Sequence, residues 1–139
     1  MSDKAFVDTN ILVYAHEPAP GIKHERARAL IEKLWETGDG VLSTQVLQEL
    51  CFNLRRKTAK PWTVEETRSL MEDYLDWQIV VNTPDSVIGA LTIEARYQIS
   101  FWDALIVHAA ERSGAAILYS EDLSDGQTYG AVRVVNPLN

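Results

Sequence analysis

Cysteine, long apolar runs and positive charge are all scarce in this chain. Cys51 is its single cysteine, which excludes an internal disulfide and a cysteine-ligated zinc site. No apolar stretch approaches the roughly 20 residues needed to span a membrane. The first residues carry no signal-peptide pattern. These absences predict a cytoplasmic protein.

The shortage of positive charge bears on the choice of partner. The chain has 20 Asp and Glu against 13 Lys and Arg, and its formal net charge is −7. Such a balance argues against a nucleic-acid partner. The objection weakens if several acids surround bound divalent cations, because a cation reverses the local potential.

The length of 139 residues predicts one domain over residues 1–139. Short apolar segments alternate with helical patterns along it. Strands are predicted over residues 4–7, 41–42, 79–81, 115–119 and 131–135, and helices over 11–15, 23–35, 43–57, 63–77, 84–97 and 100–113. A loop with Pro18 and Pro20 follows the first helical turn. This alternation predicts a three-layer α/β/α fold with a central, mostly parallel sheet of about five short strands.

Two acids follow predicted strands. Asp8 ends the first strand, and Asp122 comes just after residues 115–119. Sites in parallel sheets form outside the carboxyl ends of the strands, which favours a functional role. The alternatives are that Asp8 is a helix N-cap and that Asp122 belongs to an ordinary turn. Glu121 competes for any role given to Asp122.

Two further acids lie on predicted helices. Glu49 flanks an apolar stripe, so it belongs either to ordinary surface or to a groove. Asp103 fits a capping box with Ser100. However, the helix that Asp103 opens is apolar nearly all round and should be buried, so the acid would point at any cleft at that end.

The four acids are predicted to converge on one edge of the sheet. Two carboxylates about 4 Å apart repel by roughly 4 kcal/mol at an effective dielectric near 20, so a cluster needs a cation. Oxygen-only ligands favour Mg²⁺ or Mn²⁺ over zinc or copper.

Four segments then resemble a known family. VDTNILVYA, STQVLQEL, SFWDALIVHAA and LYSEDL look like the four acidic motifs of PIN domains, in that family's order and spacing. The nearest resemblance is to VapC-like toxins of bacterial type II toxin–antitoxin pairs. It implies a Mg²⁺- or Mn²⁺-dependent endoribonuclease that forms a homodimer and is inhibited by a cognate antitoxin. It also implies phosphodiester hydrolysis by metal-activated water, without a covalent enzyme intermediate.

The resemblance assigns roles by motif position. The metal-binding and catalytic acids are Asp8, Glu49, Asp103 and Asp122, and the supporting polar residues are Asn10, Ser43 and Ser120. The last motif departs from the usual Thr-x-Asp, because it reads Ser120-Glu121-Asp122. A serine hydroxyl makes the same hydrogen bonds, but Glu121 remains an alternative to Asp122 as the fourth acid.

One dense basic run follows Glu49 on the same helix, formed by Arg55, Arg56, Lys57 and Lys60. It is interpreted either as an RNA phosphate contact or as a solvated helix end, where cations complement the helix dipole.

Other functional classes fit the sequence less well than a nuclease. An aspartyl-nucleophile phosphatase should carry a second Asp two positions after the first, where this chain has Asn10. A phosphoacceptor domain should carry a lysine after a late strand, and none follows residues 115–119 or 131–135. A non-catalytic binding module would not need all four acids. A PIN nuclease of RNA processing, rather than a toxin, remains an alternative.

Overall fold

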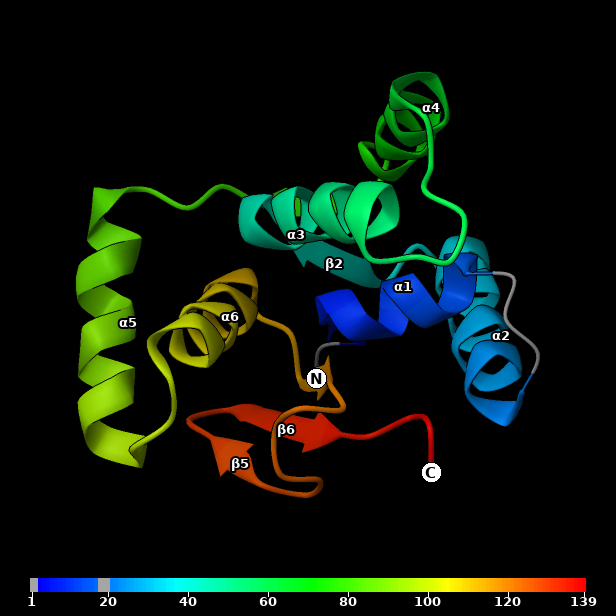
Figure 1. Cartoon of the computed structure of the whole chain (residues 1–139). Helices are drawn as coiled ribbons and strands as arrows, with labels where there is room; N and C mark the ends of the chain where they lie inside the picture. Colours follow the sequence, from blue (N-terminus) through cyan, green and yellow to red (C-terminus); the bar gives the residue numbers. More distant parts are fainter. Residues whose placement is uncertain (1–2, 18–20) are drawn as a thin grey trace.

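A mostly parallel sheet forms the centre of the computed structural model, which describes residues 3–17 and 21–139 (Figure 1). Its strand order is β3-β2-β1-β4-β6-β5, and only β5 runs antiparallel to its neighbour. The strands are β1 (Ala5–Val7), β2 (Gly40–Ser43), β3 (Gln78–Val80), β4 (Ile117–Tyr119), β5 (Thr128–Tyr129) and β6 (Val132–Val135).

The helices flank this sheet. They are α1 (Thr9–His16), α2 (Ile22–Thr37), α3 (Thr44–Arg56), α4 (Val64–Tyr74), α5 (Pro84–Tyr97) and α6 (Phe101–Ser113). Figure 1 shows α5 beside α6 and α1 beside α2, on opposite sides of the molecule. The predicted α/β class with a mostly parallel sheet is therefore confirmed.

The number of strands differs from the prediction of about five. The described residues contain six, because Thr128–Tyr129 forms a two-residue hairpin arm against β6. Two residues are too short to produce a periodic pattern, so the sequence gives no strand signal there. The predicted loop with Pro18 and Pro20 lies outside the described residues.

Helix α6 is the most buried helix, as its apolar sequence predicted. Its Ala104, Leu105, Ile106 and Val107 all belong to the core, and β1 is buried along its whole length. Because α6 begins at Phe101, Asp103 lies in the first turn of a core helix. The chain thus places one acid at the end of a rigid, buried element.

The end of α4 corrects a predicted boundary. The capping box of Thr63 with Glu66 begins this helix as predicted, but the helix ends at Tyr74 rather than at residue 77. Trp77 turns into the core, where its ring packs edge-on against Tyr74 at 5.1 Å between centroids. A Cβ atom at Gly40 in β2 would collide with the Trp77 ring. Trp77 would be buried whether the helix continued through it or ended before it, so the apolar pattern does not reveal where the helix ends.

Within the described residues, no helix is long and apolar enough to cross a membrane.

Candidate active site

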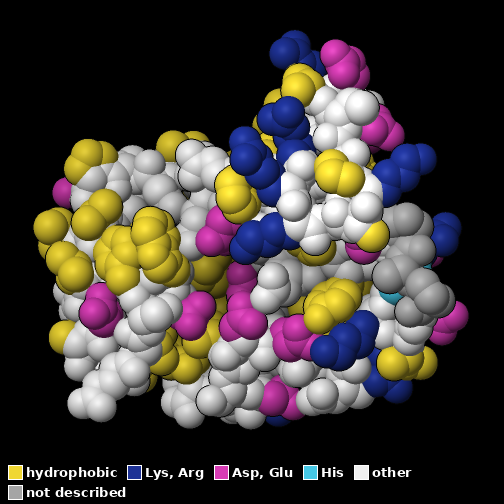
Figure 2. All heavy atoms as spheres, viewed as in Figure 1, with side chains coloured by type: hydrophobic (Ala, Val, Ile, Leu, Met, Phe, Trp, Pro, Cys, Tyr) yellow, Lys and Arg dark blue, Asp and Glu magenta, His cyan; other side chains and the backbone are white. Residues whose placement is uncertain are grey.

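A cavity of about 380 Å³ is lined by all four acids singled out in the sequence: Asp8, Glu49, Asp103 and Asp122. Their side chains come from the end of β1, from α3, from the first turn of α6 and from the segment after β4. Figure 2 shows acidic side chains across the middle of this face, with basic side chains beside them. Residues far apart in the chain therefore meet in one concave site.

Asp8 is both the N-cap of α1 and a wall of the cavity. Its Oδ1 accepts a hydrogen bond from the Thr9 backbone N–H at 2.7 Å, and its Oδ2 accepts one from Ser120 Oγ at 2.9 Å. The residue is only 5% exposed. Burial raises the pKa of Asp8 to about 7, against the effect of these hydrogen bonds, and the nearby Asp122 and Glu49 charges raise the pKa further. Asp8 is therefore a helix N-cap and a cavity residue at once, so the two interpretations that the sequence allows are compatible.

Ser120 fixes the segment that follows β4. Its buried hydroxyl donates to Asp8 and accepts hydrogen bonds from the backbone N–H groups of Asp122 at 3.2 Å and Leu123 at 3.3 Å. One side chain therefore sets the position of two strand ends relative to each other.

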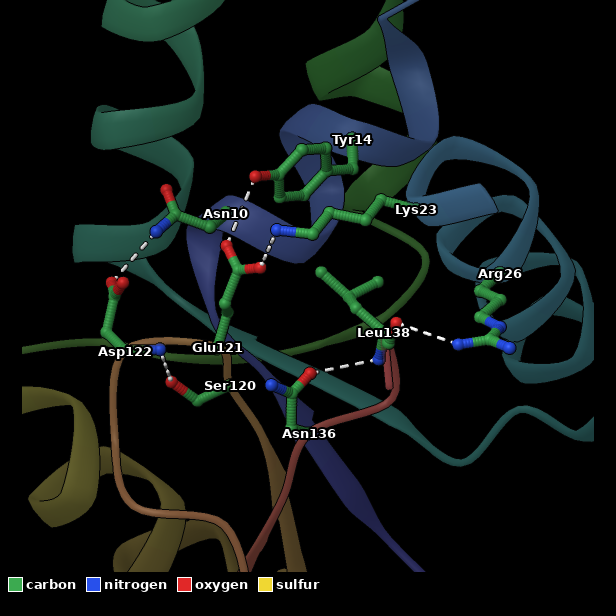
Figure 3. Close-up of polar contacts among 9 residues, drawn as sticks. All are labelled: Asn10, Tyr14, Lys23, Arg26, Ser120, Glu121, Asp122, Asn136 and Leu138. Atoms are coloured by element: carbon green, nitrogen blue, oxygen red, sulfur yellow. Dashed lines mark hydrogen bonds and ion pairs between the residues drawn. The ribbon is translucent and has the colours of Figure 1, made fainter. Parts of the chain in front are cut away.

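The structure separates Asp122 from Glu121. Asn10 Nδ2 donates to Asp122 Oδ2 at 2.8 Å, while Glu121 accepts from Tyr14 OH at 3.2 Å and from Lys23 Nζ at 2.6 Å (Figure 3). Asp122 lines the cavity, and Glu121 is not among the residues that line it. Asp122 is therefore the fourth acid that lines the cavity, whereas Glu121 joins its loop to α1 and α2.

The charge of Asp122 is disfavoured by its surroundings. Burial raises its pKa, as do the charges of Asp103 and Glu121, whereas the hydrogen bond from Asn10 lowers it. Burial and the negative charges of its neighbours therefore both act against the ionised form of Asp122.

Glu49 is held by two neutral donors. Thr9 Oγ1 donates to its Oε1 at 2.7 Å, and Gln45 Nε2 lies 3.5 Å from its Oε2. Gln45 Nε2 also donates to the backbone carbonyl of Trp102 at 3.3 Å, which links α3 to α6. The sequence placed Gln45 on the same helical face as Glu49, but it did not single out Thr9. Thr9 directly follows Asp8, but its contact with Glu49 spans 40 positions and leaves no mark in local spacing.

Asp103 makes only half of the capping box that the sequence predicted. Ser100 Oγ accepts a hydrogen bond from the Asp103 backbone N–H at 3.1 Å. In residues 3–17 and 21–139, the Asp103 carboxylate makes no hydrogen bond back to Ser100. The carboxylate lines the cavity instead.

Of the four basic residues predicted to contact RNA, Lys57 alone is among the residues that line the cavity, and Arg55, Arg56 and Lys60 are not. The Arg56 and Lys57 cations lie over the Phe52 ring, at 5.8 and 5.7 Å from its centroid. Phe52 itself lines the cavity and was missed by sequence analysis.

Ser43, predicted as a supporting polar residue, lies beneath the site rather than in it. It is fully buried and caps α3 through a hydrogen bond from the Val46 backbone N–H to its Oγ at 3.3 Å. It therefore positions the helix that carries Glu49 without lining the cavity.

The donor set can be tested for its fit to a divalent cation. Among the described residues, no three His, Cys, Asp or Glu side chains form a group that could hold a metal ion together. Mg²⁺ does not require such a group, because it keeps several waters and is commonly bound through one or two carboxylates. Four carboxylates share the cavity, and the buried Gln45 Oε1 on its wall has no hydrogen-bond partner in the described part of the chain. This oxygen-only set fits hydrated Mg²⁺ or Mn²⁺, whose charge would relieve the repulsion.

The fold and this carboxylate-lined cavity together define the class of the protein. The family model described as PIN domain matches residues 5–124, and the chain belongs to this family. No curated protein sequence matches it.

Solved structures with the same fold include toxins of bacterial toxin–antitoxin pairs. A toxin–antitoxin complex from Klebsiella pneumoniae is 16% identical, covers 96% of this chain and 98% of its own, and has a TM-score of 0.72. VapC20 of Mycobacterium tuberculosis, a sarcin-ricin loop cleaving toxin, is 21% identical, covers 86% and 90%, and has a TM-score of 0.66. VapBC2 from Rickettsia felis, bound to a promoter DNA fragment, is 20% identical, covers 94% and 96%, and has a TM-score of 0.66.

Proposed function

We propose that this protein is a metal-dependent endoribonuclease that hydrolyses RNA phosphodiester bonds and acts as the toxin of a type II toxin–antitoxin pair. The observation that carries this proposal is the cavity lined by Asp8, Glu49, Asp103 and Asp122. Membership of the PIN family supports nuclease activity. The likeness to VapC20 and to toxin–antitoxin complexes supports RNA as substrate and an antitoxin as partner.

Asp8 and Asp103 are the proposed direct ligands of Mg²⁺ or Mn²⁺, and Glu49 and Asp122 complete the shell directly or through waters. When bound, such an ion would supply an activated water and would stabilise charge on the transferring phosphoryl group. One of the four carboxylates accepts the proton of the attacking water. No side chain forms a covalent bond to the phosphate in this scheme.

Neutral side chains keep these acids in place. Asn10 orients Asp122, and Thr9 orients Glu49. Lys57 is the cavity residue that can contact a phosphate of the RNA backbone.

The experiment that tests the proposal compares two acids that each lie in the first turn of a helix. Asp103→Asn should abolish cleavage of a structured RNA in Mg²⁺ or Mn²⁺. Asp85→Asn is the matched control, because Asp85 also lies in the first turn of its helix, α5, but is exposed and outside the cavity. Near-normal cleavage by Asp103→Asn would refute the proposed site.

The acidic cavity also indicates how an antitoxin would inhibit the enzyme. A bidentate Arg suits a carboxylate cluster, so we infer that an antitoxin segment places Arg or Lys near Asp8 and Asp103. A structure of the complex with no antitoxin cation in the cavity would contradict this inference. The homodimer that the family resemblance implies and the cytoplasmic location expected from the sequence belong to the same proposal. Light scattering tests the homodimer.

A further inference from the structure

Two large aromatic side chains stand exposed at the acidic cavity. Trp102 on α6 is 62% exposed and Phe52 on α3 is 53% exposed, and both line the cavity. We propose that Trp102, with Phe52, forms a stacking platform for unpaired RNA bases next to the bond that is cleaved. This inference rests on the proposed function and names its substrate class: RNA whose bases at the cleavage site are unpaired.

The position of Trp102 is suited to this role. It directly precedes Asp103, so its ring and a proposed metal ligand leave the same helical turn. The ring packs edge-on against the half-buried Phe101 at 5.2 Å between centroids. The Trp102 carbonyl accepts a hydrogen bond from Gln45. The Trp102 backbone is therefore tied to α3 and its ring has a packing partner before any ligand binds, which reduces the entropy lost on binding.

Phe52 adds an aromatic and cationic wall. Its ring carries the Arg56 guanidinium and the Lys57 ammonium, as described above. Grooves that bind single-stranded nucleic acid commonly combine aromatic rings for the bases with cations for the backbone. Here the end of α3 and its C-cap residue Lys57 supply both, within five residues of Phe52.

Charge explains why stacking matters in this protein. The chain has a net charge of −7, and Lys57 is the cavity's basic residue among those described. Phosphate contacts supply most of the affinity of ordinary nucleic-acid-binding proteins, and that term is weak here. Stacking between a base and an aromatic ring does not depend on net charge, and every base has a face that can stack. It therefore supplies affinity that an acidic protein cannot obtain from the RNA backbone.

The first experiment combines protein and substrate changes. A synthetic RNA hairpin with a mixed-sequence loop is cleaved in Mn²⁺, the cleaved bond is mapped, and abasic sites replace the flanking nucleotides in turn. Trp102→Ala should lower kcat/KM on the intact hairpin by about 5- to 150-fold, the range for one stacked base. With the wild type, one of the abasic hairpins should show a kcat/KM lower than that of the intact hairpin by a similar factor. With Trp102→Ala, the same abasic site should lower kcat/KM little further. Trp102→Phe should restore most of the activity, and Leu75→Ala, at a 63%-exposed residue outside the cavity, should change nothing.

The second experiment measures salt dependence and stacking directly. Trp102→Ala and Phe52→Ala should each weaken RNA binding by a factor that does not change with salt concentration. Lys57→Gln should instead reduce the slope of log K against log salt by about 0.7. RNA with 2-aminopurine beside the mapped bond should lose fluorescence on binding to wild type but not to Trp102→Ala.

These readouts separate the two proposals. Cleavage by wild type with full additivity between Trp102→Ala and every abasic site would overturn the platform and leave the nuclease intact. Quenching of 2-aminopurine, scanned through the loop, without cleavage in Mg²⁺ or Mn²⁺ would support the platform and overturn the nuclease. Additivity together with a shift from dimer to monomer in Trp102→Ala, seen by light scattering, would identify the ring as a subunit contact and overturn the platform.

Discussion

The buried carboxyl of Asp8 should make the metal-free protein less stable as pH rises. Burial raises the pKa of Asp8 to about 7 in the folded protein, against its ordinary value of 3.8. Because the folded pKa is the higher one, the folded state binds more protons between these two values, and stability falls with pH there. The contribution is fully present below about pH 4 and is lost as pH rises through about 7. Each pH unit corresponds to about 1.4 kcal/mol, so ionised Asp8 costs about 4 kcal/mol in the absence of a cation.

Asp8→Asn removes this dependence but also weakens one contact. The amide keeps an oxygen for the Thr9 backbone N–H, while Ser120 Oγ loses its carboxylate acceptor. A buried polar group left unsatisfied costs about 1 to 3 kcal/mol. Asp8→Asn should therefore be more stable than wild type by about 1 to 3 kcal/mol near pH 8, and less stable by about the same amount near pH 4.

Urea unfolding in chelator across this pH range measures the effect, with exposed Asp85→Asn as the control. The difference between wild type and Asp8→Asn isolates one group from all others that titrate. Millimolar Mn²⁺ should then stabilise the wild type, by about 2.7 kcal/mol at one hundred times the dissociation constant, and Asp8→Asn much less. A difference between the two proteins that does not change sign with pH would refute the reasoning.

Three further substitutions probe the supports of the site and the fold. Ser120→Ala should lower the free energy of unfolding by about 1 to 3 kcal/mol and raise the pKa of Asp8 above 7, measurable by NMR titration. Gly40→Ala should lower the free energy of unfolding, measured in urea, by about 1 to 3 kcal/mol, because the new Cβ collides with the buried Trp77 ring. Thr63→Ala removes the N-cap of α4 and should lower the thermal stability by about 1 kcal/mol, with cleavage unchanged.

The fold could be predicted from the sequence wherever an element is long or clearly bounded. Helix α6 ends at Ser113 because Gly114, its C-cap, adopts a left-handed backbone conformation, and Pro84 marks the start of α5. The sequence did not predict β5, because a strand of two residues is too short to produce a periodic pattern. The boundary after Tyr74 was misplaced because Trp77 suits a helix stripe and a core turn equally well.

The site was predictable to the extent that the chain order fixes it. Asp8 and Asp122 follow parallel strands that pair directly, so topology alone brings them to one edge. Side-chain direction was not predictable, because it depends on contacts between distant segments. Glu121 is held outside the cavity by Tyr14 and Lys23, which lie more than ninety positions earlier in the chain. The exposure of Trp102 likewise has no signature in local spacing.

The partners of each acid distinguish the acids of the site from their neighbours. Three of the four cavity carboxylates are held by hydrogen bonds from uncharged side chains, in the pairs Asp8–Ser120, Glu49–Thr9 and Asp122–Asn10. Such donors fix a carboxylate without cancelling its charge. In contrast, Glu121 is paired with Lys23, and among the described residues neither of the two salt bridges includes a cavity acid. Acids that serve only the fold gain stability from a basic partner, whereas neither salt bridge of the described residues supplies one to the four cavity acids. The uncharged hydrogen-bond donors of Asp8, Glu49 and Asp122 therefore support the proposed metal site more strongly than the number of acids does.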